Sequence, residues 1–339
     1  MSMDLAIDLG TSNIRIYSDK KGKMLDEPSV VTIDIDTGNV LALGKEASKM
    51  IGRTSNRIKA LYPLTGGVIS DFYLVEEMIS TMLKGVCNSK FIMPKVVACV
   101  PGEITDVEKR AVFDAIRNIG MRKVYLIEAQ KAAALGAGLD INDSHGIFVV
   151  DIGGGTTDIA VISLGDIVTS RSIKIAGNLF DDEIVKYIKR KYNLIVGAKM
   201  AEEAKIAIGC VVPQKGLEPF KIKGRNAVTG IPQAVDITPD EMIEALYDPA
   251  MQIIRTMQTV LEQTSPELVS DIYSDGMTLT GGGSQLRGFP ELIKDYLNLN
   301  VNPIENPADC VVNGCGKALK FTKLLKSTTM GSINPLSEK

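Results

Sequence analysis

Apolar runs and polar turns follow one another along this chain in an order that occurs twice. In residues 4–18 an apolar run ends in an aspartate, a turn of Gly, Thr, Ser and Asn follows, and a second apolar-rich run returns. Residues 147–161 repeat this order around a Gly-Gly-Gly-Thr-Thr turn. Short apolar runs bounded by such turns are typical of β-hairpins. The copies lie too far apart for a solenoid repeat, so the pattern predicts a duplicated domain with one hairpin in each lobe.

Strands alternate with helices elsewhere in the chain, which predicts an α/β fold. Two predicted helices start with a capping box, Thr105 with Glu108 and Thr238 with Glu241. A Pro-, Gly- and Lys-rich stretch at 210–237 lacks helical periodicity and predicts a small β-containing insert. The other predicted elements are strands at 95–100, 124–127, 147–150 and 277–280, and helices at 132–138, 180–192 and 198–208.

Composition narrows the class of protein. Hydrophobic residues make up 45% and charged residues 23% of the 339 positions, and the formal net charge is −3. These values are ordinary for a globular protein and give no sign of a nucleic-acid partner. The five cysteines lack metal-ligand spacing, and no apolar run reaches the ~18–20 residues of a membrane span. We therefore expect reduced thiols and a cytoplasmic protein.

The turns of the two predicted hairpins are suited to phosphate. Backbone N–H groups can approach a phosphate only where residues are glycine or small, as in Gly10–Asn13 and Gly153–Thr157. Tight packing would explain one such turn equally well, whereas two copies in the same context favour a ligand. Asp8 and Asp151 occupy equivalent strand ends, where they could hold Mg²⁺ or simply cap their turns.

A third glycine turn, Gly281–Ser284, follows a predicted strand and would let the flat face of a nucleoside approach the backbone. Glu202 and Lys205 lie three residues apart on a predicted helix and therefore share a face. On spacing alone, this pair is more typical of an exposed ion pair than of a binding site.

These motifs resemble the superfamily of actin, Hsp70 and the sugar kinases, and within it the MreB family of bacterial actins. The superfamily motifs are Asp8–Thr11, Asp151–Thr157 and Gly281–Gly283. Stretches similar to MreB follow in order along nearly the whole chain: Glu27–Val31, Gly52–Thr54, Gly67–Phe72, Val100–Pro101, Ile162–Gly165, Ala201–Glu202, Pro266–Leu268 and Leu279–Gly283.

The resemblance implies an actin-like, two-lobed α/β fold. In it, duplicated mixed-sheet domains of the ribonuclease H type enclose a nucleotide cleft, and the chain divides into four subdomains. These are IA (1–30, 70–142 and 317–339), IB (31–69), IIA (143–178 and 239–316) and IIB (179–238).

The resemblance also implies ATP or ADP with Mg²⁺ as the bound ligands. Asp8 and Asp151 would hold the metal, and Thr156 and Thr157 would take part in catalysis. The residues implied to bind the nucleotide are Thr11, Ser12, Asn13, Gly153, Gly154, Gly155, Thr156, Glu202, Lys205, Gly281, Gly282, Gly283 and Ser284.

Members of the family assemble head to tail into paired filaments on the inner face of the cytoplasmic membrane. The resemblance therefore implies self-association, co-assembly with paralogous chains and a peripheral membrane location. A kinase of the same superfamily and an ATP-binding adaptor that does not polymerise are the alternatives. The absence of Trp and the 5% aromatic content, together with the substitution described next, suggest a paralogue of the Spiroplasma type acting in cell shape, helicity and motility.

One position departs from the family at the catalytic step. The family's Ile-Glu-Glu-Pro reads Ile127-Glu128-Ala129-Gln130 here, so alanine replaces the glutamate implied to orient the attacking water. Losing a positioned acid–base group lowers the rate by about 10²–10⁴. We therefore expect ATP binding with weak hydrolysis, with Gln130 as a candidate to orient water. Glu128 is a poorer substitute, because neighbouring strand residues point to opposite faces.

Two segments are candidates for contact with a membrane surface. Phe91, Ile92 and Met93 follow a lysine and are suited to insert among lipid headgroups, although they could instead begin the strand at 95–100. Residues 317–326 alternate lysines with leucines and a phenylalanine. This pattern predicts a basic helix that binds the membrane or docks on the first lobe.

Overall fold

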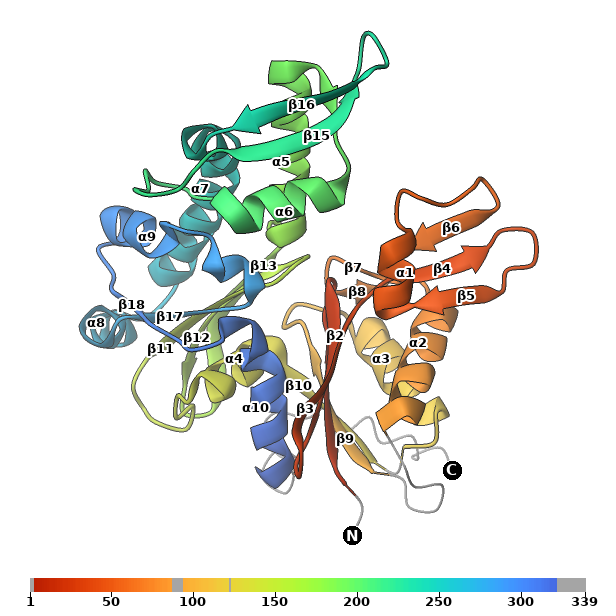
Figure 1. The fold of residues 1–339 in the computed structure, drawn as a ribbon. Coiled ribbons are helices and arrows are strands. Elements are labelled where there is room, and N and C mark those ends of the chain that lie inside the picture. The colour runs from red at the N-terminus through yellow and green to blue at the C-terminus, as the bar shows by residue number, and fades with distance from the viewer. Residues whose placement is uncertain (1–2, 87–93, 122, 322–339) are drawn as a thin grey trace.

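The structure is a computed structural model that describes residues 3–86, 94–121 and 123–321. In these residues two five-stranded mixed sheets form the framework (Figure 1). The first sheet has the order β10 (Lys123–Glu128), β9 (Lys95–Val100), β1 (Leu5–Leu9), β2 (Asn13–Ser18) and β3 (Gly22–Pro28). The second has the order β13 (Asp166–Ile173), β12 (Thr157–Ser163), β11 (Ile147–Ile152), β17 (Met277–Thr280) and β18 (Val301–Asn302).

The two sheets share one topology. In each, a hairpin and a third strand pair antiparallel, and two further strands join parallel to the first strand of the hairpin. The duplication predicted from the repeated hairpins is therefore confirmed. The equivalent strands β1 and β11 are apolar along most of their length because both of their faces are covered.

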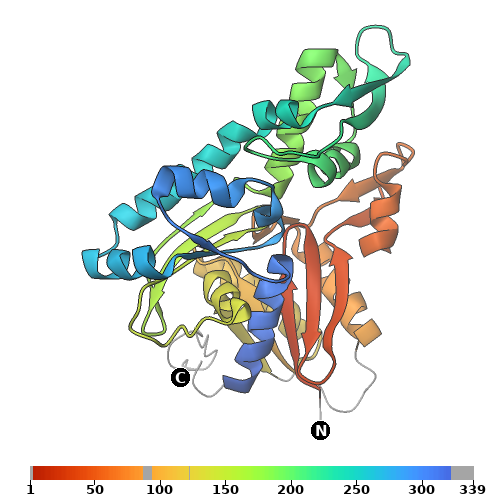
Figure 2. The same cartoon turned by 60° about the vertical axis from the view of Figure 1, so that its left-hand side comes forward.

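A pair of helices, α4 (Ala129–Ala137) and α10 (Cys310–Ala318), lies between the sheets (Figures 1 and 2). Helix α10 contacts β1 and β9, and α4 contacts β11 and β12. Two glycines allow the helices to approach closely. A Cβ atom on Gly136 would lie 1.8 Å from the Cys310 carbonyl oxygen, and one on Gly314 would lie 1.8 Å from that of Ala132.

Alternate residues of each central strand enter different cores. Ile7 packs with α2 (Phe72–Val86) and α3 (Asp106–Asn118), whereas its neighbour Ala6 packs with α4 and α10. On the second sheet the outer core includes residues of α5, α7, α8 and α9. These helices span Gly177–Tyr192, Pro239–Glu262, Pro266–Asp275 and Phe289–Leu297. Both predicted capping boxes, at Thr105 and Thr238, are confirmed.

A small sheet is attached to each large one, and Figure 2 shows both at the same end of the molecule. The first contains β5 (Val40–Leu43), β4 (Val31–Asp34) and β6 (Ile58–Leu61), with α1 (Gly44–Met50) beside it and the short pair β7 (Leu64–Thr65) and β8 (Val68–Ile69) following. The second contains β14 (Leu194–Ile195), β15 (Phe220–Asn226) and β16 (Pro232–Ile237), packed on α6 (Ala198–Ile208). The predicted β-containing insert is thus confirmed.

The described part of the predicted basic helix at 317–326 packs against the protein. Lys317 Nζ donates to the Leu135 carbonyl oxygen at 2.7 Å, and Leu319 is buried in η3 (Leu319–Phe321). Residues 322–326 and the candidate membrane residues Phe91, Ile92 and Met93 lie outside the described residues. Across the described ranges, no helix is both long and apolar enough to span a bilayer.

Candidate functional site

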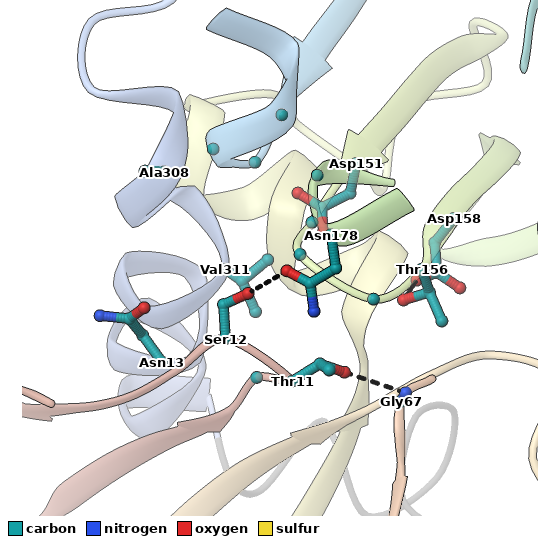
Figure 3. Close-up of a pocket in the computed structure, with 18 of the residues that line it drawn as sticks. Thr11, Ser12, Asn13, Gly67, Asp151, Thr156, Asp158, Asn178, Ala308 and Val311 are labelled. Atoms are coloured by element: carbon teal, nitrogen blue, oxygen red, sulfur yellow. Dashed lines mark hydrogen bonds between the residues drawn. The ribbon is translucent and has the colours of Figure 1, made fainter. Parts of the chain in front are cut away.

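A cavity of about 620 Å³ lies where the turns of the two equivalent hairpins, β1–β2 and β11–β12, face each other (Figure 3). Its walls come from both large sheets, from α6, and from the turn η1 (Gly282–Gln285) after β17. A volume of this size is suited to a ligand as large as a nucleotide.

The two glycine turns lie against each other, and the first turn also bonds to α5 and to the segment between β7 and β8. The Ser12 hydroxyl donates to Asn178 Oδ1 at 3.0 Å, and the Gly67 amide donates to Thr11 Oγ1 at 3.0 Å (Figure 3). A Cβ atom on Gly154 would lie 1.8 Å from Ser12 Oγ, and one on Gly155 would lie 2.5 Å from Thr11 Oγ1. Glycine is therefore required in the second turn, because any side chain would collide with the first turn.

Most of the residues predicted to bind a nucleotide or metal line this cavity. They are Asp8, Thr11, Ser12, Asn13, Asp151, Gly153, Gly154, Gly155, Thr156, Glu202, Lys205, Gly281, Gly282 and Gly283. Three predicted site residues lie behind the lining instead. Ser284 Oγ donates to the Gly281 carbonyl oxygen, Thr157 Oγ1 donates to that of Ile175, and Gln130 Nε2 donates to Asp158.

Glu202 and Lys205 share the face of α6 that lines the cavity, as their spacing predicted. Lys205 Nζ lies 2.8 Å from Asp181 Oδ1 and donates to the Gly177 carbonyl oxygen at 2.9 Å. Burial raises the pKa of Asp181 to about 6 although Lys205 opposes this shift. The lysine is thereby tied to the first turns of α5, beside the glycine turn of β11–β12.

The two predicted metal ligands have different partners. Asp8 lies 3.5 Å from the Arg15 guanidinium and accepts a hydrogen bond from Cys99 Sγ, whereas Asp151 accepts one from the neutral Thr280 hydroxyl at 2.7 Å. Burial raises the pKa of Asp8, and it raises that of Asp151 to about 7. Both carboxylates face a cavity in which a cation would stabilise their ionised forms.

Asp158 is a cavity residue to which the sequence analysis gave no role. Its carboxylate accepts from Thr156 Oγ1 at 3.0 Å and from Gln130 Nε2 at 3.4 Å, and burial raises its pKa to about 6. The signal was present, since Asp158 closes the repeated hairpin motif. Asn178 and Arg15 were also missed. Arg15 could have been found from hairpin register, because it pairs directly with Asp8.

Position 129 lies in the cavity wall. Ala129 lines the cavity at 8% exposure, immediately after β10. Glu128 does not line it, and its carboxylate lies 3.3 Å from the ammonium group of Lys131, which is only 3% exposed. Gln130 is fully buried, and its Oε1 has no hydrogen-bond partner among the described residues. An alanine methyl group therefore occupies the wall position that the family resemblance assigned to a carboxylate.

Two sheets of identical topology with a glycine-lined cavity between them define a protein of the actin-like class. In agreement with this, the fold matches MreB5 of Spiroplasma citri bound to ADP, with a TM-score of 0.92 and 35% identity over 96% of this chain and 99% of that one. The same protein bound to AMPPNP gives a TM-score of 0.90 with 36% identity. The MamK double helical filament structure shares the fold, with a TM-score of 0.79 at 23% identity over 95% of this chain and 98% of MamK.

The chain belongs to the MreB/Mbl protein family, whose model matches residues 2–327. It is 47% identical over 318 residues to the cell shape-determining protein Mbl of Bacillus cereus, covering 94% of this chain and 96% of that protein. The family resemblance and the actin-like fold predicted from the motifs are therefore confirmed, and the protein is a bacterial actin homologue of the MreB/Mbl family.

Proposed function

We propose that this protein binds ATP and ADP in the cavity, assembles into cytoskeletal filaments and hydrolyses ATP only weakly. The observation that carries the proposal is the meeting of two glycine turns on one cavity, with an alanine at position 129 in its wall. The crystal structures of the similar MreB5 with ADP and with AMPPNP support a nucleotide as the ligand.

The polyphosphate is expected between the two turns. Gly154 and Gly155 line the cavity there together with the side chains of Thr11 and Ser12, and backbone N–H groups of such glycine turns bind anions. Glu202 and Lys205 on α6 are expected at the ribose and adenine, with Gly281–Gly283 beneath the nucleoside. This arrangement would make each lobe contribute to one ligand.

The donor set fits a magnesium ion that keeps most of its waters. Asp8 and Asp151 are buried oxygen donors on equivalent strands, and Mg²⁺ commonly uses one or two carboxylates together with phosphate oxygens. When bound, the ion would neutralise phosphate charge. Among the described residues there is no cluster of three or more His, Cys, Asp or Glu side chains that could hold a metal ion.

Hydrolysis would depend on the residues around position 129. Thr156 and Asp158 form the polar part of this wall, and Gln130 acts from behind it by holding Asp158. Without a carboxylate at position 129, a water molecule is less well oriented toward the phosphate. Phosphoryl transfer depends mostly on positioning and electrostatics, so nucleotide binding would persist while turnover is slow.

Self-association is the cellular part of the proposal. A relative that shares nearly half of the sequence carries the name cell shape-determining protein, and the fold is one that a double helical filament also uses. We propose filaments of this chain, alone or with paralogues, at the inner face of the cell membrane, where they would serve cell shape and, in a wall-less swimmer, motility.

Negative-stain electron microscopy of the purified protein with Mg-ATP, Mg-ADP and no nucleotide tests this proposal, combined with equilibrium binding of ATP. Filaments with ATP are the expected result. ATP binding without filaments in any state would point to a monomeric adaptor. ATP turnover stimulated by a small-molecule acceptor would point to a kinase of the same superfamily.

The proposed membrane contact has a separate test. Flotation with anionic liposomes is expected to decrease when Phe91 and Ile92 are both changed to serine, because the apolar side chains would no longer enter the headgroup region. Unchanged flotation of the double variant would remove this segment from the proposal.

A further inference from the structure

Arg15 lies in the cavity wall beside one of the two proposed metal ligands. It pairs with Asp8 across the β1–β2 hairpin, and its Nη1 lies 3.5 Å from Asp8 Oδ2. The Arg15 side chain is only 19% exposed. A cation this desolvated needs charged partners, and nothing in the function proposed so far uses it.

Two further carboxylates hold the guanidinium from behind. Nε donates to Asp26 Oδ2 on β3 at 3.3 Å and lies 3.6 Å from Asp309 Oδ1, at the end of η2 (Pro307–Asp309). Lys23 Nζ shares both partners, at 2.6 Å from Asp309 and 3.9 Å from Asp26. Since Asp309 belongs to the second half of the chain, Arg15 is fixed by both halves and is not free to swing away from the cavity.

Arg15 differs from the other cations that line the described cavity. Lys205 is tied to Asp181, and Arg287 Nη1 donates to the Ile206 carbonyl oxygen at the end of α6. Arg15 alone of these three stands on a phosphate-facing hairpin. A guanidinium has five N–H donors, of which Nε is used by Asp26, so the terminal nitrogens retain donors for an anionic oxygen.

We propose that Arg15 is a phosphate-binding residue of this protein, whose guanidinium contacts the polyphosphate of the nucleotide and supplies positive charge next to Asp8. It shares the neutralisation of the phosphates with the divalent cation, and Asp26 and Asp309 are its positioning residues. This inference rests on the proposed function, namely that the cavity binds ATP.

Equilibrium binding of ATP, ADP and adenosine, in Mg²⁺ and in EDTA, tests the role of Arg15. Arg15→Leu is expected to weaken ATP and ADP binding by about 10–100-fold, the range of a lost hydrogen bond to a charged group, and to leave adenosine binding unchanged. The loss is expected to be larger in EDTA, where no divalent cation compensates. Arg57→Leu is the matched control. Arg57 also pairs with a carboxylate, at 2.9 Å from Asp34, but it does not line the cavity.

Equal weakening of ATP and adenosine would overturn the proposal, because it would show that Arg15 only holds the two halves in place. Unchanged ATP affinity would overturn it as well. If Arg15→Leu does not fold, Arg15→Lys is used for the test, because lysine keeps the positive charge but lacks the paired N–H donors of a guanidinium. A selective loss of ATP affinity is again expected. Failure of the proposed function is distinguishable, because the unchanged protein would then bind no ATP in either buffer.

Discussion

The two hairpins that face the cavity have one backbone design and two different charge balances. In the first, Asp8 is paired with Arg15, and side chains of Thr11, Ser12 and Asn13 form the turn. In the second, three glycines form the turn, and the one hydrogen bond to the Asp151 carboxylate among the described residues comes from the neutral Thr280 hydroxyl. Burial raises the pKa of Asp151 to about 7, and the hydrogen bond from Thr280 only partly opposes this shift.

The two hairpins share one pattern of strand pairing but differ in the groups that contact their aspartates. The first hairpin carries its own countercharge, so its aspartate is partly neutralised before any ligand arrives. The second hairpin has a turn of glycines and two carboxylates, Asp151 and Asp158, whose pKa values are raised by burial to about 7 and about 6. We infer that the ionised carboxylates of the second hairpin depend more strongly on a bound cation than Asp8 does. The second hairpin also contributes Thr156 and Asp158 to the cavity wall around position 129.

The largest effect is expected from restoring a carboxylate beside the second hairpin. Ala129→Glu is expected to raise the rate of phosphate release by about 10²–10⁴, because position 129 lines the cavity and a positioned acid–base group has an effect of this size. Single-turnover phosphate release with saturating Mg-ATP measures it. An equal rate in both proteins would show that Asp158, Thr156 and Gln130 already suffice.

Filling the second turn is expected to have the next largest effect. Gly154→Ala places a Cβ atom 1.8 Å from Ser12 Oγ, so the two turns must separate, and we expect ATP affinity to fall about 100-fold, equivalent to about 3 kcal/mol. Gly85→Ala is the control, because a Cβ atom there meets nothing within 4 Å. Retention of ATP affinity by Gly154→Ala would show that the turns do not act as one cradle.

Neutralising the two aspartates one at a time should show directly how the charge balance of the two hairpins differs. The pKa of Asp151 rises from 3.8 to about 7 on folding, so its contribution to stability is present below pH 3.8 and is lost as the pH rises through 7. In metal-free protein at pH 8, Asp151→Asn is therefore expected to raise the free energy of unfolding by about 2 kcal/mol, discounting for relaxation. Thermal unfolding in EDTA measures this gain, which should shrink as the pH falls to 5.

Asp8→Asn is the matched variant on the first hairpin. It leaves the largely buried Arg15 without its nearest cavity-side partner, so we expect no gain, or a loss, in stability under the same conditions. An equal gain from both variants would contradict the difference in charge balance between the hairpins.

The smallest effect concerns a carboxylate whose partners outweigh its burial. Burial raises the pKa of Glu241, but hydrogen bonds from Tyr192, the Thr238 amide and Lys191 together lower it from 4.5 to about 2. Its contribution to stability is present above pH 4.5 and is lost as the pH falls toward 2. Glu241→Gln is expected to lower the free energy of unfolding by about 1 kcal/mol at pH 7, less at pH 3, in urea titrations. If the loss of stability did not depend on pH, Glu241 would stabilise the start of α7 through its capping hydrogen bonds and not through its charge.

Much of the fold was predictable because its signals are local. The capping boxes at Thr105 and Thr238, the insert at 210–237 and the repeated hairpin each depend on residues a few positions apart. Helix α5 shows the limit, since it begins at Gly177, three residues before the predicted start. Its first turns contact the Gly153–Gly154 carbonyl groups and Lys205, and these partners are distant in sequence.

The candidate site was predictable where the motif itself makes the contact. Gly153, Gly154 and Gly155 were assigned from their type and position, and the structure places all three in the cavity lining. Asn178 and Arg15 could not be assigned in the same way. The importance of Asn178 comes from Ser12 in the other half of the chain, and that of Arg15 from three carboxylates on three different segments.

The sequence by itself determined that the chain has two copies of a hairpin whose turn suits a phosphate, and it predicted an α/β fold, because these properties follow from residue type and short-range spacing. The resemblance of its motifs to a known family implied the actin-like class and showed an alanine where that family has a glutamate. Only the tertiary structure decided that Ala129 lines the cavity while Glu128 is paired with Lys131, and that Asp8 is paired with Arg15 while Asp151 accepts a hydrogen bond from Thr280. The physical reason is that burial and ion pairing depend on groups brought together by packing, which the order of residues along the chain does not contain.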